Sequence, residues 1–261
     1  MRYRTLLNEI TIDRGVTKIC VRKDSRSNKL RVEMWVMEQA LIQGLKVPRP
    51  ISYSVNAHNQ EILVMERIIG TALTSQISSE SCASFHDIGR QLGQAIRKYR
   101  GFGWINPETM TGVYATWLDF LTDYICRYSS QVIKAGYLKQ TELEITLEAL
   151  EKEPLLNLPK SGLVHRDLKP SNIINTTQGA FLIDWECAML GDPEYDLAVY
   201  LINYGHGLHW SNLLSGFGQF HPRLIHLYQI SALIGAIDFR LTFHQPVKKK
   251  SLYLSRLIKG L

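Results

Sequence analysis

Two short polar strings constrain this chain more than any other feature of its sequence. The first is His165-Arg166-Asp167-Leu168-Lys169-Pro170-Ser171-Asn172, and the second is Phe181-Leu182-Ile183-Asp184-Trp185-Glu186. A single His-x-Asp is common, and a capped turn explains it. Here a complete loop of polar residues is followed by an apolar strand that ends in a carboxylate. The combination predicts one polar site that both segments build.

The residue types of this site suit phosphoryl transfer, which needs positioning and charge neutralisation more than covalent chemistry. Asp167 is expected to orient an acceptor hydroxyl and to accept its proton. Asn172 and Asp184 supply oxygen ligands of the kind that hold Mg²⁺ on the triphosphate of ATP. Lys169 is expected to neutralise charge on the moving phosphoryl group. The sequence therefore predicts an enzyme with ATP as phosphoryl donor and Mg²⁺ as cofactor.

The residues after Asp184 narrow the class of kinase. The chain runs directly into Gly191-Asp192-Pro193-Glu194-Tyr195-Asp196-Leu197-Ala198, without the long activation segment of protein kinases. With the two strings above, this half of the chain resembles the aminoglycoside phosphotransferase and choline kinase-like family, which shares the protein-kinase-like fold. The resemblance implies phosphorylation of a hydroxyl on a small molecule. Two departures keep a protein kinase as an alternative, because His-Gly-Asp is commoner in the family and Lys169 is more typical of protein kinases.

The resemblance also implies an α+β fold of two lobes. Residues 1–69 are expected to form a small antiparallel-sheet N-lobe that binds the nucleotide. Residues 70–261 are expected to form a mostly helical C-lobe with the catalytic loop and the acceptor site. A length of 261 residues with 45% hydrophobic content is enough for one such unit with a substantial core.

The first part of the chain predicts a hairpin, in which Ile10 to Ile12 pair with Lys18 to Val21 across a turn. The second of these strands resembles the family's strand that ends in a basic residue at the nucleotide phosphates. The resemblance assigns this role to Arg22. Lys23 is the alternative, because a register error of one residue exchanges the two.

A helix is predicted over residues 31–43, ending at a glycine before a proline-rich turn. The resemblance matches Glu33, and not Glu38, to the family's glutamate near the helix start, so Glu33 is expected to pair with Arg22. The later strand is expected to lead into the hinge, where backbone groups from Glu66 to Ile68 meet the adenine edge. Met65 is expected to shape the pocket behind the adenine.

One part of the family pattern is missing. Members place a loop of small residues before the first hairpin, whereas this chain has no glycine before Gly15. We therefore expect the first strand and the phosphate-covering loop to be incomplete. A non-catalytic nucleotide-binding protein or sensor is the alternative that this feature favours.

Charge and cysteine content indicate partners and compartment. The net charge is +6, and the segment from Val247 onward is basic, but its leucine and isoleucine spacing predicts a helix docked on the core rather than a nucleic-acid or membrane contact. Four scattered cysteines predict neither a disulfide framework nor a zinc site, and favour a reducing, cytoplasmic compartment. The sequence leaves the oligomeric state open.

The acceptor is constrained only by charge. A glutamate-rich helix predicted over Thr141 to Glu153 could attract a cationic acceptor, although a solvated helix face explains its charges equally. From His206 onward, Asp238 is the only acidic residue among several lysines and arginines. We therefore expect a neutral or singly charged hydroxylated metabolite to be preferred over a polycationic antibiotic.

Overall fold

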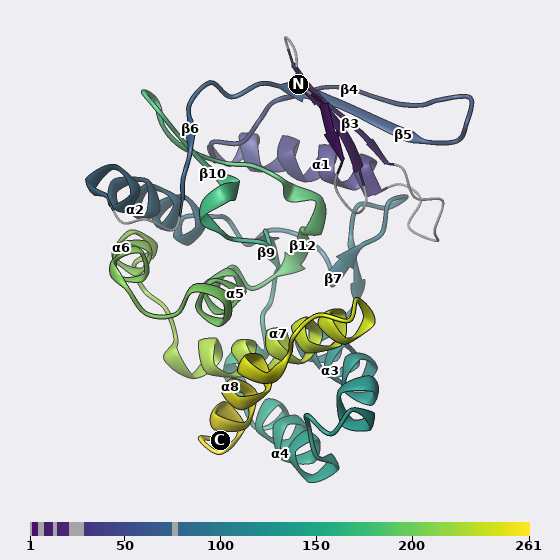
Figure 1. Ribbon diagram of the computed structural model, residues 1–261, viewed down its shortest axis with the longest axis vertical. Helices are drawn as coiled ribbons and strands as arrows, with labels where there is room; N and C mark the ends of the chain where they lie inside the picture. The colour runs from purple at the N-terminus through teal and green to yellow at the C-terminus, as the bar shows by residue number, and fades with distance from the viewer. Residues whose placement is uncertain (1, 5–7, 13–14, 21–28, 75–77) are drawn as a thin grey trace.

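The computed structural model describes residues 2–4, 8–12, 15–20, 29–74 and 78–261 of the chain. Figure 1 shows a sheet with one helix at the N-terminal end of the molecule and a larger, mostly helical part beyond it. The first lobe is one antiparallel sheet in the order β1-β2-β3-β5-β4. Its strands are β1 (Arg2–Arg4), β2 (Asn8–Ile12), β3 (Gly15–Cys20), β4 (Pro50–Val55) and β5 (Glu61–Glu66).

The predicted hairpin is confirmed, because β2 and β3 pair antiparallel with Ile10 opposite Lys18. A first strand is present, since β1 pairs with β2 and places Tyr3 opposite Ile10, but it has only three residues, so the incomplete first strand and phosphate-covering loop stay a prediction. A three-residue strand needs few residues and no apolar alternation, so the sequence pattern carries little trace of it. The connection between β1 and β2, residues 5–7, contains no glycine and lies outside the described residues.

The helix of the first lobe, α1 (Lys29–Ile42), begins at a carboxylate from the neighbouring sheet. The buried side chain of Glu61 accepts hydrogen bonds from the backbone N–H groups of Lys29, Leu30 and Arg31, at 3.0, 2.8 and 3.1 Å. These groups have no partner within the helix, and a negative charge there also stabilises the helix dipole. Glu61 therefore fixes where α1 starts and how it lies against β4 and β5.

The second lobe contains most of the helices. These are α2 (Ser79–Gly93), α3 (Trp117–Lys134), α4 (Gln140–Glu151), α5 (Glu194–Tyr204), α6 (Leu208–Phe217), α7 (Pro222–Thr242) and α8 (Lys248–Ile258), with short 3₁₀ helices η1 (Pro154–Leu156), η2 (Pro170–Asn172) and η3 (Trp185–Cys187). Two small sheets complete it, in the orders β11-β10-β6 and β8-β7-β12-β9. Their strands are β6 (Thr71–Ala72), β7 (Phe102–Ile105), β8 (Gly112–Tyr114), β9 (Gly162–Val164), β10 (Ile173–Thr176), β11 (Gly179–Leu182) and β12 (Met189–Gly191).

The core of the second lobe lies where α3, α5 and α7 pack together. Trp117, Tyr195 and Tyr228 come from these three helices and are almost completely buried. Helix α7 is long and apolar enough to cross a membrane by composition, but 67% of its apolar window is buried, as in a core helix. Helix α8 docks on α7 through buried Leu254 and Ile258, which confirms the predicted docking.

Two attachments join the lobes near α2. The backbone of Lys46, in the connection between α1 and β4, accepts a hydrogen bond from the Leu182 N–H at 2.9 Å and donates one to Gln91 at 2.7 Å. At the other attachment, Gly70 lies so close to β10 that an added Cβ would come within 2.2 Å of the Asn175 oxygen. Beyond Gly70 the chain pairs with β10, so residue 71 already belongs to the second lobe.

Candidate active site

A hairpin of the second lobe brings Asn172 and Asp184 together. Strands β10 and β11 pair with Ile173 opposite Leu182, and the Ile183 N–H donates to the Asn172 carbonyl at 2.9 Å. Asn172 precedes β10 and Asp184 follows β11, so both side chains emerge at the same end of the hairpin. The 11 residues between them are therefore closed into a local unit by backbone pairing.

The catalytic loop before β10 places three polar groups around one carboxylate. Lys169 Nζ lies 2.6 Å from Asp167 Oδ2, and Asn172 Nδ2 donates to the same oxygen at 3.0 Å. The side chains of Asp167 and Lys169 are 36% and 33% exposed, so a substrate can reach them. Burial alone would lower the pKa of Lys169, but its contact with Asp167 raises it. Lys169 is therefore a cation beside Asp167 at neutral pH.

His165 supports the loop by hydrogen bonding, as its position in the string predicts. Its ring is fully buried, and Nδ1 accepts a hydrogen bond from the Asp167 N–H at 3.2 Å. The other nitrogen, Nε2, lies 2.9 Å from the Ile183 carbonyl, which can only accept. The two contacts together require the neutral tautomer with its proton on Nε2. His165 thus ties the catalytic loop to the strand that leads to Asp184.

Asp196 in the first turn of α5 braces the same loop from below. Its two carboxylate oxygens accept the backbone N–H groups of His165 at 2.8 Å and Arg166 at 2.7 Å. Asp196 is completely buried, and burial raises its pKa against the effect of these donors. Because the carboxylate bonds consecutive amides, it fixes the direction in which the next residue, Asp167, leaves the loop.

Asp192 holds the loop's support in place and does not face the catalytic residues. It accepts hydrogen bonds from Arg97 at 2.6 Å and from the Tyr228 hydroxyl at 3.0 Å, and Tyr228 in turn accepts from Trp117 at 2.9 Å. The preceding Gly191 packs on the same indole, where an added Cβ would lie 2.5 Å from the ring. This network explains both the glycine and the aspartate of the Gly-Asp-Pro string.

Arg166 occupies the position where the family usually has glycine, and its backbone explains why. Its φ is +65°, a conformation that costs a residue with a side chain about 1–2 kcal/mol. The guanidinium carbon lies 4.4 Å from the centre of the Trp104 ring and 5.6 Å from that of Tyr124. Such cation–π contacts are worth about 1–2 kcal/mol when desolvated, so they offset the strain.

The first lobe contributes a buried lysine to the site. Lys18 in the middle of β3 donates to both carboxylate oxygens of Glu33 in α1, at 2.8 and 3.1 Å, and to Asp184 at 2.6 Å. Lys18 and Glu33 are 5% and 1% exposed. Burial alone would lower the pKa of Lys18, but the carboxylates around it raise it well above its ordinary value. Burial would also raise the pKa of Asp184, whereas the Lys18 charge holds it below the usual range.

This geometry differs from the expected partner of Glu33. Within the described residues Glu33 pairs with Lys18, whereas Arg22 and its alternative Lys23 lie outside them. Lys18 was missed because the resemblance assigned the phosphate contact to a basic residue at the end of the strand, whereas Lys18 lies inside β3. The available signal was parity, since Lys18 and Arg22 point to the same side of a regular strand. A lysine flanked by Thr17 and Ile19 in a buried hairpin also needs a counter-ion.

The donor set at the base of the cleft suits Mg²⁺. Asn172 Nδ2 donates to Asp167, which leaves the Asn172 carbonyl oxygen for a metal. Asp184 uses Oδ1 for Lys18 and is 33% exposed, so the carboxylate remains accessible. Mg²⁺ commonly takes one or two protein oxygens and completes its shell with phosphates and water. The described residues contain no group of three His, Cys, Asp or Glu that could hold a metal alone.

The predicted hinge follows β5. Glu66 is its last residue, and both its N–H and its carboxylate are bonded to the Arg49 backbone at 2.9 Å. The N–H of half-buried Ile68 has no backbone partner within the described chain. Met65 is buried beneath the sheet. The Glu66 carbonyl and the Ile68 N–H are thus the hinge groups that an adenine edge can use.

Tyr204 is an aromatic residue whose pKa is affected by Lys169 and Asp167 of the catalytic loop. It ends α5, is 43% exposed, and stacks on buried Tyr200 at 5.2 Å between ring centres. Burial raises its pKa, while Lys169 opposes this effect and Asp167 adds to it. Sequence reasoning did not assign it a role, because a helical aromatic pattern is more often part of a core.

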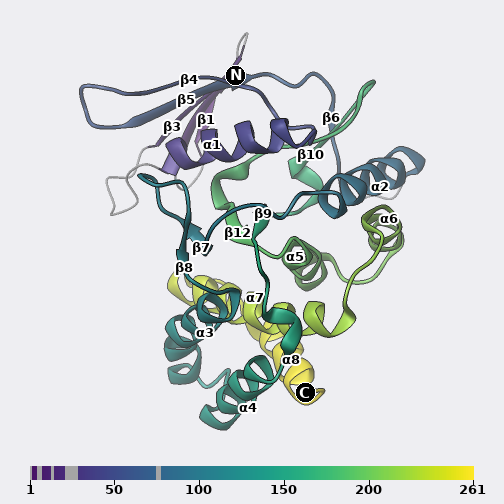
Figure 2. The ribbon, with the colours of Figure 1, turned by 180° about the vertical axis from the view of Figure 1, so that it is seen from behind.

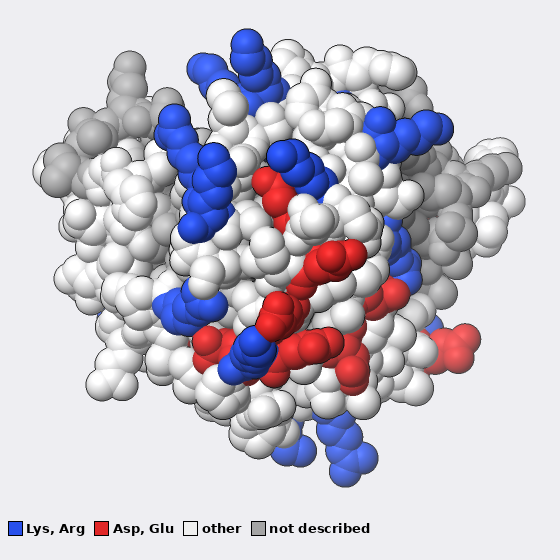
Figure 3. All heavy atoms as spheres, turned by 90° about the horizontal axis from the view of Figure 1, so that it is seen from below, with Lys and Arg blue, Asp and Glu red and all other residues white. Residues whose placement is uncertain are grey.

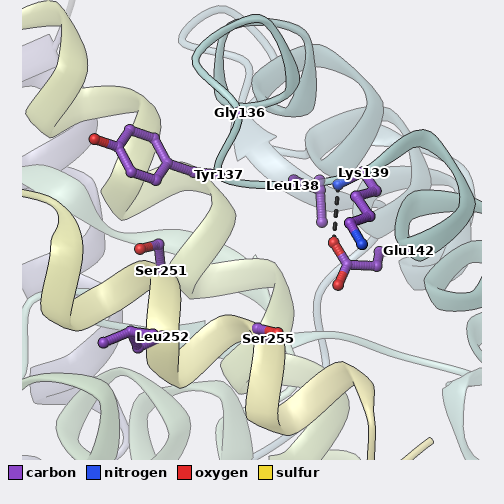
Figure 4. Close-up of a pocket in the computed structure, with 8 residues that line it drawn as sticks. All are labelled: Gly136, Tyr137, Leu138, Lys139, Glu142, Ser251, Leu252 and Ser255. Atoms are coloured by element: carbon purple, nitrogen blue, oxygen red, sulfur yellow. Dashed lines mark hydrogen bonds between the residues drawn. The ribbon is translucent and has the colours of Figure 1, made fainter.

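A separate groove of about 210 Å³ lies between the connection that precedes α4 and one face of α8. Figure 4 shows Ser251 and Ser255 on the α8 side and Tyr137 on the other. Figures 1 and 2 place α4 and α8 at the end of the molecule away from the first lobe. The groove is therefore distinct from the site that Asp167 and Asp184 form.

Comparison with known proteins agrees with this arrangement. The sequence profile of the phosphotransferase enzyme family matches residues 13–224. A protein LicA homolog of Mycoplasma capricolum is 36% identical over 70 residues, covering 24% of this chain and 29% of that protein. The matched segment thus spans less than a third of that relative's length.

Solved structures share the fold at low sequence identity. An apo aminoglycoside phosphotransferase APH(4)-Ia has a TM-score of 0.75 and 17% identity, with 100% of this chain and 94% of that one covered. A fructosamine-3-kinase from Haemophilus somnus, named there as putative, has a TM-score of 0.68 and 17% identity, with 100% of this chain and 90% of that one covered. The choline kinase LicA of Streptococcus pneumoniae has a TM-score of 0.66 and 17% identity, with 98% of this chain and 91% of that one covered. The chain belongs to the phosphotransferase enzyme family and has a protein-kinase-like fold.

Proposed function

We propose that this protein transfers the terminal phosphoryl group of ATP to a hydroxyl group of a small molecule. One observation carries the proposal: an accessible Asp167, held by Lys169 and Asn172, lies in a loop that His165 ties to the segment between β11 and Asp184. The absence of a long segment between Asp184 and Gly191 supports a small-molecule acceptor over a protein.

Each residue has a defined part in this reaction. Asp167 orients the acceptor hydroxyl and takes its proton as the oxygen attacks the γ-phosphorus. Lys169 Nζ, 2.6 Å from that carboxylate, is placed to neutralise charge on the transferring group. Lys18, held by Glu33, faces the phosphates from the first lobe. The catalytic residues thus come from one loop, and the phosphate contact comes from the sheet above it.

Mg²⁺ would be held by Asn172 and Asp184 and would neutralise charge on the triphosphate. Two solved relatives of the fold, both APH(4)-Ia, carry AMP-PNP or ADP with hygromycin B, which supports ATP as the donor. Lys18 already uses its donors on Glu33 and Asp184. A metal that engages Asp184 would release one of them for a phosphate, so we expect Mg²⁺ and ATP to bind cooperatively.

The acceptor is proposed to be neutral or singly charged. The glutamates of α4 gather at the end of the molecule opposite the first lobe, where Figure 3 shows the acidic cluster. They therefore do not surround Asp167. The described side chains that contact the Asp167 carboxylate are Lys169, a cation, and Asn172, which is neutral. A polycation finds little there to balance its charge.

A phosphorylation screen with labelled ATP tests the function and the acceptor class together. The acceptors are kanamycin, choline, a macrolide and simple amino sugars, and an Asp167→Asn variant serves as the blank. Turnover of a neutral or singly charged acceptor that Asp167→Asn abolishes supports the proposal. Strong turnover of kanamycin at physiological salt would overturn the acceptor class. Saturable ATP binding without any turnover would instead indicate a nucleotide sensor.

The division into lobes and the compartment complete the proposal. We place the boundary between residues 69 and 70, because Thr71 begins the strand that pairs with β10 of the second lobe. A cytoplasmic location remains a prediction from the cysteines, of which Cys82, Cys126 and Cys187 are free thiols.

A further inference from the structure

Glu186 contacts three elements of the first lobe, although it belongs to the second. Its Oε2 accepts a hydrogen bond from Asn8 Nδ2 at the start of β2 and lies 3.6 Å from Lys18 Nζ in β3. Its Oε1 lies 3.8 Å from Lys29 Nζ at the start of α1. Asp184, two residues earlier, is the expected metal ligand. One side chain therefore joins the metal-binding segment to β2, β3 and α1.

These contacts are shielded from water. The Glu186 side chain is 17% exposed, Lys18 is 5% exposed and Asn8 is 2% exposed. Ion pairs on an open surface contribute little, but a buried donor that loses its acceptor costs about 1–3 kcal/mol. The contacts of Glu186 are thus strong enough to hold β2 and β3 at a fixed distance from the second lobe.

We infer that Glu186 is a positioning residue for the nucleotide triphosphate, acting through Asn8 and Lys18. This inference rests on the proposed kinase function and extends it to a residue that the sequence motifs left without a role. Glu186 holds β2 and the phosphate-facing Lys18 of β3 at a fixed distance from Asp184. It compensates in this way for a first hairpin that has no glycine before Gly15.

The contacts of Glu186 also distinguish this role from metal binding. Oε2 accepts a hydrogen bond from Asn8, and the ammonium groups of Lys18 and Lys29 lie 3.6 and 3.8 Å from the two oxygens, so protein groups already balance the charge of this carboxylate. Asp184 shares only one oxygen with Lys18. Glu186 therefore acts on nucleotide affinity through the protein, and its loss leaves the dependence of the rate on Mg²⁺ unchanged.

A double-mutant cycle on nucleotide KM tests the inference. Glu186→Ala and Asn8→Ala are each expected to raise the KM for ATP roughly fivefold to tenfold, with kcat changed less than about twofold. The KM of the double variant is expected to be no higher than that of the single variant with the higher KM, because each change removes the same contact. Glu186→Gln, which keeps an acceptor for Asn8, is expected to recover part of the affinity.

The matched control combines Asn8→Ala with Glu38→Gln, because Glu38 is an exposed glutamate of α1. The effects of these two changes on the KM for ATP should be additive. Thermal unfolding checks each fold, and a cycle of Glu186→Ala with Lys29→Ala replaces the first if Asn8→Ala is unstable. Additive effects of Glu186 and Asn8, or a shift in the Mg²⁺ dependence at saturating ATP, would overturn the inference. Binding of AMP-PNP with Mg²⁺ to the wild-type protein tests the kinase function separately. If the wild type does not bind AMP-PNP, both the kinase function and the role of Glu186 are overturned.

Discussion

The catalytic loop and strand β3 reach the same site from opposite lobes, but they are held in place by different forces. The loop is fixed by backbone hydrogen bonds, to Asp196 from below and through His165 to Ile183 beside it. Lys18 is fixed by side-chain charge, between Glu33 of α1 and Asp184 of the second lobe. Removing one side chain should therefore disturb the first-lobe half of the site more widely than the loop. The variants below test that difference.

The largest loss of activity is expected from Asp184→Ala, because Asp184 contacts Lys18 of the first lobe and belongs to the second-lobe half of the site. It removes the proposed metal ligand and one counter-ion of Lys18 together. A bound metal contributes several kcal/mol of charge stabilisation, so a loss of about 4 kcal/mol should lower kcat/KM about 1,000-fold. Turnover measured across a range of Mg²⁺ concentrations checks this, and a near-normal rate in the variant would remove Asp184 from the site.

Lys18→Met compared with Arg22→Met should show which basic residue serves the first lobe. Lys18→Met leaves the buried Glu33 and Asp184 without their cation, a change that costs about 3–5 kcal/mol. Arg22→Met should change stability much less. Urea unfolding measures the free energies, and an equal loss in the two variants would contradict the assignment of Lys18.

The same pair predicts a difference in pH dependence. In the wild type the Lys18 charge holds the pKa of Asp184 below its usual value, so its contribution to stability is present above about pH 4 and is lost below it. In Lys18→Met burial raises the pKa of Asp184 and, further, that of Glu33. The folded state then binds more protons than the unfolded state, and stability should fall as pH rises from 4 to 7. A flat profile for Lys18→Met in this range would contradict the electrostatic account.

A smaller effect is expected from Glu33→Gln, with Glu38→Gln as its control on the same helix. Glu33→Gln keeps the shape and removes the charge that orients Lys18. A hydrogen bond to a charged group is worth about 1.5–3 kcal/mol, so kcat/KM should fall roughly tenfold or more. Glu38 is exposed and its change should be within twofold, about the precision of such a comparison. Equal effects would show that the register of α1 is wrong.

The smallest effect concerns the backbone of the loop. Arg166→Ala loses the contacts with Trp104 and Tyr124 but keeps a side chain at φ +65°, so it should be about 1–2 kcal/mol less stable than the wild type. Arg166→Gly relieves the strain and should be about 1 kcal/mol more stable than Arg166→Ala. Urea unfolding compares the two. The opposite order would show that backbone strain is not what this position stores.

The two halves also differ in how far the sequence predicted them. Asp167, Lys169, Asn172 and Asp184 were placed correctly relative to one another, because a loop and a hairpin between them keep their spacing local. Whether they act as assigned stays a prediction. The partner of Glu33 lies 15 positions away on another element, and choosing it required knowing how β3 and α1 pack together. The contacts of Glu186 with Asn8 span 178 positions and left no trace in the local pattern.

The same reasoning explains which parts of the fold were found. The helices with apolar faces were predicted because burial of one face imposes a period on the sequence. The three residues of β1 are too few to show any period.

The attachments at Lys46 and Gly70 determine how the two lobes can rotate. The Lys46 backbone, before β4, is bonded to β11 and α2, and Gly70, after β5, is pressed against β10, so the first lobe is held to the second at these two points. Two pinned points define an axis. Any rotation about it leaves α2 and the hinge almost still and moves the far edge of the first sheet, β1 and β2, through the longest arc. A contact at this edge, such as that of Glu186 with Asn8, therefore has the greatest leverage on how far the two lobes separate.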